Sequence, residues 1–152
     1  MKNYNELKLA KELIRFPTVK TEDKGIMKFL SKKLTAIGFK CKIIKSKGIG
    51  SKQALNLYAR FGRSKPHINF LGHTDVVANL NNWKIPPFKA VVKKGYLNGR
   101  GSQDMKGGIA CFISAISNFI ENNKFKGSIS IIISADEETT GYGCPAVIKH
   151  LR

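Results

Sequence analysis

Carboxylate side chains are scarce in this sequence, and half of them lie in three short segments. The chain has 10 Asp and Glu residues among its 152. Five of them accompany His73 in segments that also carry glycine: Asp75, Asp104, Asp136, Glu137 and Glu138. Histidine with several carboxylates, and without a cysteine nearby, is a ligand set that suits zinc, manganese or cobalt. The clustering therefore predicts a metal site.

His73 and Asp75 directly follow a short apolar stretch, residues 67–71, which is typical of a strand. Side chains two residues apart lie on the same side of extended backbone. Asp75 would then accept a hydrogen bond from one imidazole nitrogen and leave the other nitrogen facing a metal. For this pair alone, a purely structural histidine is the alternative.

Glu137 and Glu138 follow a second apolar stretch, residues 128–134. In extended backbone two adjacent side chains point apart, so one carboxylate would bind metal while the other reaches a water as general base. Taken alone, such a pair is more often a solvated turn.

Asp104 lies in the segment Gly99-Arg100-Gly101-Ser102-Gln103-Asp104-Met105-Lys106-Gly107-Gly108. Glycines permit close backbone approach, and an aspartate at the start of a helix is placed to bridge two cations. The alternative is an aspartate that only caps the helix.

The apolar spacing predicts the elements that position these residues. Helical spacing occurs in four segments and strand patterns in four, with a hairpin between the third and fourth strands. The helices are expected at 4–15, 22–37, 106–122 and from about 145 onwards, the strands at 39–44, 54–61, 67–71 and 128–134, and the hairpin at 90–97. Helices alternating with strands indicate an α/β fold with a mixed, mostly parallel sheet flanked by helices. Ligands bind at the carboxyl ends of such strands, so the three acidic segments are expected to converge at one edge of the sheet.

Four motifs in order carry a resemblance to a known family. They are GHTDVV at 72–77, PPFKA at 86–90, GRGSQDMKGGIA at 99–110 and SADEE at 134–138. The sequence resembles the dinuclear zinc peptidases and deacylases (M20-like), a family that includes desuccinylases, deacetylases and aminoacylases. The resemblance implies an α/β zinc-peptidase catalytic domain.

The resemblance also implies roles for individual residues. His73 resembles a terminal ligand of one zinc ion, Glu138 a terminal ligand of the second, and Asp104 the ligand that bridges them. Asp75 resembles the carboxylate that orients His73, and Glu137 resembles the general base that activates water for attack on an amide. In this family the peptide bond after Asp104 is expected to be cis.

The implied cofactor is Zn²⁺, two ions in a complete site, with Co²⁺ or Mn²⁺ as substitutes. The implied substrate is a small N-acyl amino acid. The wording of HTDVV and PPFKA favours an N-succinyl substrate, and an N-acetyl amino acid deacetylase and a carboxypeptidase are the alternatives. Family members of full length are expected to form homodimers.

Family members are more than twice as long as this chain. Residues 1–152 are therefore expected to form a partial, truncated catalytic domain, without its C-terminal part and without the lid or dimerisation domain. Each zinc ion would then lack about one protein ligand, which predicts weak, single-metal or absent binding. A non-catalytic remnant of such an enzyme is the alternative.

The formal charge of +17 raises the question of a nucleic-acid partner. The excess consists of 22 Lys against 5 Arg, spread along the whole chain, and Arg is the residue that contacts phosphates and bases in two places at once. We therefore expect a solvated basic surface, no nucleic acid and no membrane partner. Three separated cysteines without CxxC spacing indicate buried free thiols, and the lack of a signal-peptide pattern favours the cytoplasm.

Overall fold

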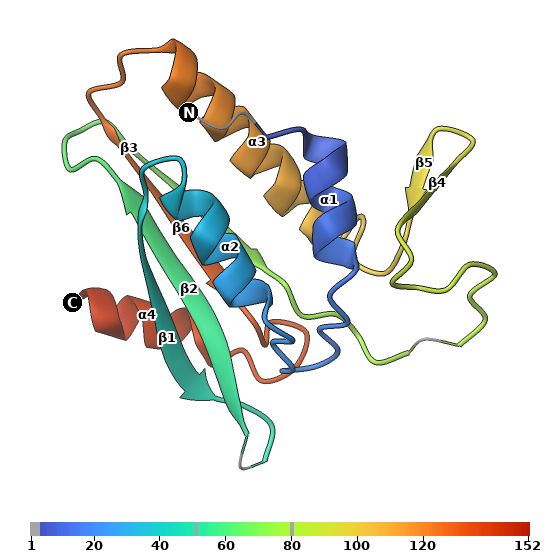
Figure 1. Ribbon diagram of the computed structural model, residues 1–152. Coiled ribbons are helices and arrows are strands. Elements are labelled where there is room, and N and C mark those ends of the chain that lie inside the picture. The colour runs from blue at the N-terminus through green and yellow to red at the C-terminus, as the bar shows by residue number, and fades with distance from the viewer. Residues whose placement is uncertain (1–3, 51, 80) are drawn as a thin grey trace.

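The computed structural model describes residues 4–50, 52–79 and 81–152. These residues form two helices, then five strands, and then a helix, a strand and a last helix (Figure 1). In order they are α1 (Glu6–Ile14), α2 (Ile26–Thr35), β1 (Lys40–Lys47), β2 (Gln53–Phe61), β3 (His67–His73), β4 (Val91–Lys93), β5 (Tyr96–Asn98), α3 (Lys106–Asn122), β6 (Ser128–Ser134) and α4 (Gly143–Leu151). The helices and strands expected from the sequence are all present. The largest difference in bounds is at α2, which begins at Ile26 and not at residue 22, and β1 runs three residues further than expected, to Lys47.

The main sheet has the strand order β1-β2-β6-β3, and β4 pairs with β5 in a separate hairpin. The α/β class and the mixed sheet flanked by helices are confirmed. The expected excess of parallel pairs is wrong, because β1–β2 and β2–β6 are antiparallel and only β3–β6 is parallel in the described sheet. The physical reason is the connection: β1 and β2 are joined by a short turn, which allows only an antiparallel pair, whereas α3 crosses over between β3 and β6.

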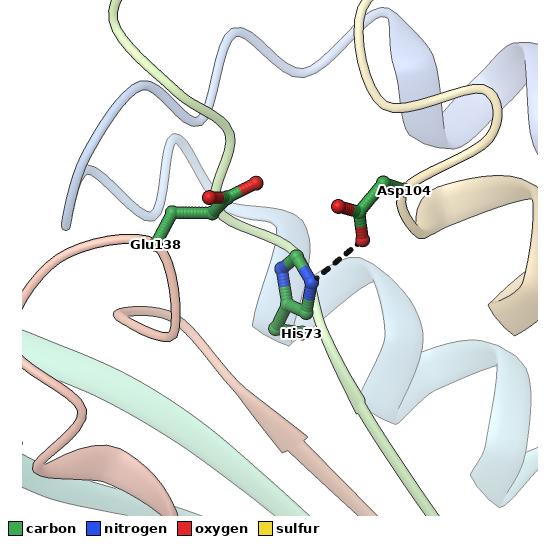
Figure 2. Close-up of side chains that lie close together, drawn as sticks. All are labelled: His73, Asp104 and Glu138. Atoms are coloured by element: carbon green, nitrogen blue, oxygen red, sulfur yellow. Dashed lines mark hydrogen bonds and ion pairs between the residues drawn. The ribbon is translucent and has the colours of Figure 1, made fainter.

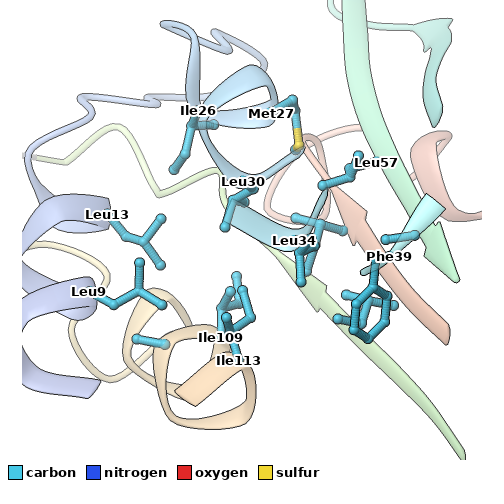
Figure 3. Close-up of a cluster of buried hydrophobic side chains, with 14 of the residues drawn as sticks. Leu9, Leu13, Ile26, Met27, Leu30, Leu34, Phe39, Leu57, Ile109 and Ile113 are labelled. Carbon is cyan, nitrogen blue, oxygen red and sulfur yellow. The ribbon is translucent and has the colours of Figure 1, made fainter. Parts of the chain in front are cut away.

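One face of the sheet carries the main core. Alternate residues of β6 point to opposite faces, so Ile129, Ile131 and Ile133 pack with α1, α2 and α3. Figure 3 shows core side chains that these three helices contribute. Ile132 points the other way and packs with Ile44 and with Val147 of α4. The sheet is therefore covered by three helices on one face and by α4 on the other.

The helix α3 is less enclosed than its apolar sequence suggested. Ile109, Ile113 and Ile116 are buried, but Cys111 is exposed and the Phe119 side chain is 44% exposed. Apolar residues nearly all round the segment 106–122 predict a helix buried on most faces, but the helix is buried only on the face that meets α1 and the sheet. Within the described residues, no helix is both long and apolar enough to cross a lipid bilayer.

Candidate metal centre

Three side chains from three segments meet beyond the carboxyl ends of β3 and β6 (Figure 2). His73 is the last residue of β3, Asp104 lies in the loop before α3, and Glu138 lies in the loop after β6. One ligand atom from each of these residues lies within 4.8 Å of the others. The parallel pairing of β3 with β6 sets His73 opposite Ser134, which brings the following loop to the same edge.

The two ring nitrogens of His73 face different surroundings. Nδ1 lies 3.1 Å from the backbone oxygen of Asp75 and 3.5 Å from its Oδ1. Nε2 lies 3.0 Å from Asp104 Oδ1 and 3.7 Å from Glu137 Oε2. His73 is buried, whereas the side chains of Asp104 and Glu137 are 70% and 61% exposed. The imidazole is thus held from behind by Asp75 and presents its other nitrogen to the open side.

Three carboxylates, those of Asp75, Asp104 and Glu137, lie within 4 Å of the imidazole of His73 and surround it with negative charge. Burial alone would lower the pKa of His73, but the hydrogen bonds and charge of Asp75, together with the charge of Glu137, raise it to about 9. Burial and the nearby charge of Asp104 raise the pKa of Glu138. Carboxylates that repel one another beside a buried imidazole form a site that a cation would stabilise.

Asp75 also holds the loop that carries the two glutamates. Its Oδ1 accepts a hydrogen bond from the backbone N–H of Glu137 at 3.1 Å, and its Oδ2 accepts one from Glu138 at 2.8 Å. Glu137 and Glu138 lie in a turn and not in extended backbone. The expectation that their side chains point apart is therefore wrong, and both carboxylates lie near His73.

Lys106, the first residue of α3, ties the start of this helix to the segment after α1, a role that the sequence did not suggest. Its side chain is fully buried, and Nζ donates to the backbone oxygen of Phe16 at 2.7 Å. Burial lowers the pKa of Lys106 to about 8, and the charge of Asp75 opposes this shift. A lysine next to an apolar helical segment was the sequence signal that could have indicated this buried amine. The peptide bond between Asp104 and Met105 is cis, as expected.

Asp136 and the other two histidines lie outside this cluster. Asp136 is fully buried behind the turn and bonds within its own loop. His67 contacts the hydroxyl oxygens of Ser128 and Ser130, and His150 is exposed on α4. None of the three cysteines forms a disulfide, but Cys111 is exposed, which corrects the expectation that all are buried.

A cleft of about 410 Å³ opens beside Asp104 and Glu138. Its far wall is formed by Trp83 and by Arg100, whose guanidinium carbon lies 5.1 Å from the centre of the indole ring. A larger hollow of about 610 Å³ lies between Tyr4 and Ser114, away from the acidic cluster. The smaller cleft is thus the one that gives access to the candidate ligands.

The donor set fits a divalent cation. Imidazole nitrogen and carboxylate oxygen are ligand types that zinc binds, and three protein ligands with a further position left open are typical of catalytic zinc sites. The orienting contact from Asp75 to the other imidazole nitrogen is the arrangement that metal-binding histidines usually have. The exposed carboxylate of Asp104 would hold the ion on the solvent side.

The sequence matches the family described as Peptidase family M20/M25/M40 over residues 70–152. It is 49% identical to a succinyl-diaminopimelate desuccinylase of Pelagibacter ubique, an alignment that covers 100% of this chain and 41% of that protein. It is 43% identical to a protein of the same name from Ehrlichia canis, with 95% of this chain and 39% of that protein covered. The chain thus spans about two fifths of the length of these curated relatives.

Solved structures share the fold at low sequence identity. Human carnosine dipeptidase 1 superposes with a TM-score of 0.80 at 20% identity, covering 95% of this chain and 34% of that one. A structure described as an M20 family metallo-carboxypeptidase from Sulfolobus solfataricus superposes with a TM-score of 0.77 at 22% identity, covering 91% and 32%. At this identity the likeness concerns the fold.

Proposed function

Because this chain belongs to peptidase family M20/M25/M40, we propose that it forms part of a metal-dependent hydrolase of linear amides. The observation that carries the proposal is the meeting of His73, Asp104 and Glu138, which come from three separate segments, within 4.8 Å at one edge of the sheet. Residues 1–152 would act as a partial catalytic domain, which the coverage of 41% of a curated relative supports.

His73, Asp104 and Glu138 would hold the metal, with Asp75 orienting the imidazole. Zn²⁺ is the ion we propose, with Co²⁺ or Mn²⁺ as substitutes, since imidazole and carboxylate ligands suit all three. Two ions, bridged by Asp104, would require further ligands beyond these three. A bound divalent cation supplies Lewis-acid chemistry, which polarises a carbonyl and lowers the pKa of water.

Glu137 is the residue we assign to proton transfer. Its Oε2 lies 3.7 Å from His73 Nε2, on the open side of the site, and its side chain is 61% exposed. Glu137 would take a proton from the attacking water, and the resulting hydroxide would add to the amide carbonyl carbon. When the C–N bond breaks, Glu137 would return the proton to the departing amine.

The substrate we propose is N-succinyl-LL-diaminopimelate, split into succinate and LL-diaminopimelate for lysine and cell-wall precursor synthesis. The support is the identity of 49% and 43% to proteins named as succinyl-diaminopimelate desuccinylases. N-acetylornithine and short peptides are the alternative substrates. The homodimer and the cytoplasmic location expected from the sequence stay predictions.

The metal-binding part of the proposal is tested by titrating the chain with Co²⁺ and following its visible absorption. The wild type is expected to bind one ion weakly, because further protein ligands are missing, and His73→Ala is expected to weaken binding by at least about 10-fold more, because it removes the buried nitrogen ligand. His67→Ala is the matched control, since His67 begins the same strand and is bonded to serines away from the cluster. Equal binding by His73→Ala and His67→Ala would contradict the assignment.

Hydrolysis is tested separately on the metal-loaded protein with N-succinyl-LL-diaminopimelate and N-acetylornithine. Turnover of the succinyl compound that is lost in Glu137→Gln, with metal affinity kept, would support the hydrolase and the role of the base. Metal binding without turnover of either compound would support the alternative of a non-catalytic remnant.

A further inference from the structure

The turn that carries Glu137 and Glu138 is wrapped around one buried carboxylate, Asp136. Its Oδ2 accepts hydrogen bonds from Thr140 Oγ1 at 2.5 Å and from the backbone N–H of Tyr142 at 2.9 Å. Its Oδ1 accepts one from the backbone N–H of Gly143 at 2.9 Å. Asp136 is fully buried, so these three donors take the place of water.

The backbone of Asp136 closes the same turn. Its carbonyl oxygen accepts hydrogen bonds from the backbone N–H of Gly141 at 2.8 Å and of Thr139 at 3.2 Å. The carboxylate also lies at the N-terminus of α4, where the helix dipole favours a negative charge. Residues 136–143 are therefore closed into one loop by a single residue.

Tight packing around Asp136 leaves the loop little freedom. A β-carbon added at Gly143 would lie 2.2 Å from Asn56 Oδ1 and 2.5 Å from Asp136 Oδ1. Asn56 Oδ1 accepts a hydrogen bond from the backbone N–H of Ala135 at 3.2 Å, and its amide group donates to the backbone oxygen of Ile44. The loop is thus anchored to β2 directly behind the two glutamates.

We propose that Asp136 is a positioning residue for the metal centre: it fixes the turn whose other side is held by Asp75, and so aims Glu138 and Glu137 at His73. This inference rests on the proposed function, because it concerns how the ligand Glu138 and the base Glu137 are held. On one side of the turn, Asp75 accepts hydrogen bonds from the backbone N–H groups of the two glutamates. On the other side, Asp136 accepts three hydrogen bonds from later residues of the loop. Loss of either carboxylate frees the turn from one side.

The substitution Asp136→Asn tests the proposal with nearly unchanged shape. An asparagine offers one acceptor oxygen and places an NH₂ group against the remaining N–H donors, so at least one buried donor loses its partner. Residues that orient metal ligands typically change metal affinity by about 10- to 100-fold when mutated. We expect Asp136→Asn to raise the Kd for Co²⁺ by that factor.

A second readout follows the turn in the metal-free protein. The N–H groups of Glu137 and Glu138 are bonded to Asp75, so their hydrogen exchange reports how firmly the turn is held. We expect exchange of these two amides to be at least about 10-fold faster in Asp136→Asn. Thr140→Val removes one hydrogen bond to Asp136 and keeps the carboxylate, so it should raise the Kd for Co²⁺ and the amide exchange rates by smaller factors. If Asp136→Asn does not fold, Thr140→Val tests the positioning role in its place.

Ile120→Val is the matched control for a loss of stability without a change at the turn. Ile120 is buried in the main core. It lies about 21 Å along α3 from Lys106, at the end of the helix far from the loop that carries Asp104. It should leave the Kd for Co²⁺ and the exchange of both amides as in the wild type. Faster exchange and a higher Kd in Asp136→Asn alone would support the positioning role.

Two outcomes would overturn the inference in distinguishable ways. If Asp136→Asn and Thr140→Val bind Co²⁺ as the wild type does, or no more weakly than Ile120→Val, Asp136 does not position the centre and the proposed function stands. If the wild type itself binds no Co²⁺, the proposed metal site fails and the inference falls with it.

Discussion

At the scale of single residues, Asp75 connects the two strand ends that form the candidate centre. One carboxylate contacts the imidazole of His73 and accepts the N–H groups of Glu137 and Glu138. It is 1% exposed, so its charge is satisfied by these groups and not by water. The residue assigned from the sequence to orient a histidine therefore also sets the position of the second acidic segment.

Two of the cysteines should differ in reactivity. Burial raises the pKa of Cys41, and hydrogen bonds with Thr35 and Ser31 oppose part of that shift, whereas Cys111 is exposed on α3. Alkylation requires the thiolate. A raised pKa therefore lowers the fraction of Cys41 that is thiolate at pH 8, and the alkylation rate of Cys41 should rise only at higher pH. We expect iodoacetamide to modify Cys111 first, as followed by peptide mass spectrometry between pH 7 and 10.

The sign of the Cys41 effect on stability follows from the same shift. Because the folded pKa lies above the unfolded one, the contribution of Cys41 to the free energy of unfolding is fully present below the unfolded pKa. It is lost as the pH rises through the folded pKa. Equal alkylation rates for Cys41 and Cys111 at pH 8 would show that Cys41 is not shielded.

At the scale of elements, two adjacent glycines in the first turn of α3 should respond oppositely to alanine. A β-carbon at Gly107 would lie 2.1 Å from the backbone oxygen of Ser102, whereas one at Gly108 would have no described atom within 4 Å apart from its chain neighbours and the nearby backbone of its own helix. Gly108→Ala should stabilise the protein by about 0.5–1 kcal/mol, because alanine has the higher helix propensity. Gly107→Ala should destabilise it, because the loop that carries Asp104 must move.

Thermal unfolding measures both glycine variants on one scale. For a chain of this length, about 1 kcal/mol corresponds to roughly 2–4 °C in Tm. Gly108→Ala is the internal control for the presence of a methyl group in this turn. A Tm for Gly107→Ala equal to that of Gly108→Ala would show that α3 and its preceding loop are not packed as described.

At the scale of the whole molecule, β3 forms an edge of the described sheet and exposes apolar side chains. Ile68 is 55% and Leu71 is 50% exposed, and beside Ile68 an apolar hollow of about 230 Å³ is lined by Phe112 and Phe119. Exposed apolar edge strands pair with other chains. We expect the isolated 152-residue chain to self-associate with rising concentration, as measured by sedimentation velocity.

Charge on this edge should reduce that association. Ile68→Lys and Leu71→Lys are expected to shift the sedimentation profile towards the monomer, because a lysine must be desolvated to enter such an interface. Val92→Lys is the control, since Val92 is 44% exposed on the separate β4–β5 hairpin. Association that is equally sensitive to Val92→Lys, or insensitive to all three changes, would place the contact elsewhere.

Local patterns predicted most elements, and the failures have physical causes. The bounds of α3 and β6 match the expected segments because each is a long apolar run with a clear period. Strand direction was misjudged because alternation of helices and strands says nothing about the pair β1–β2, whose short turn makes it antiparallel. Burial of α3 was overestimated because apolar character does not show which face meets the core.

The sequence by itself determined which residues are available for metal chemistry: His73, Asp104 and Glu138 stand out by type, by neighbouring glycines and by their places next to strands and a helix. Only the tertiary structure decided that they meet within 4.8 Å, and that Asp136 and Lys106 serve as internal supports. The physical reason is that ligand types are local properties of the chain. Which side chains meet, which carboxylate is buried, and which backbone oxygen a buried amine reaches, as Lys106 reaches Phe16, depend on how strands and helices distant in sequence pack together.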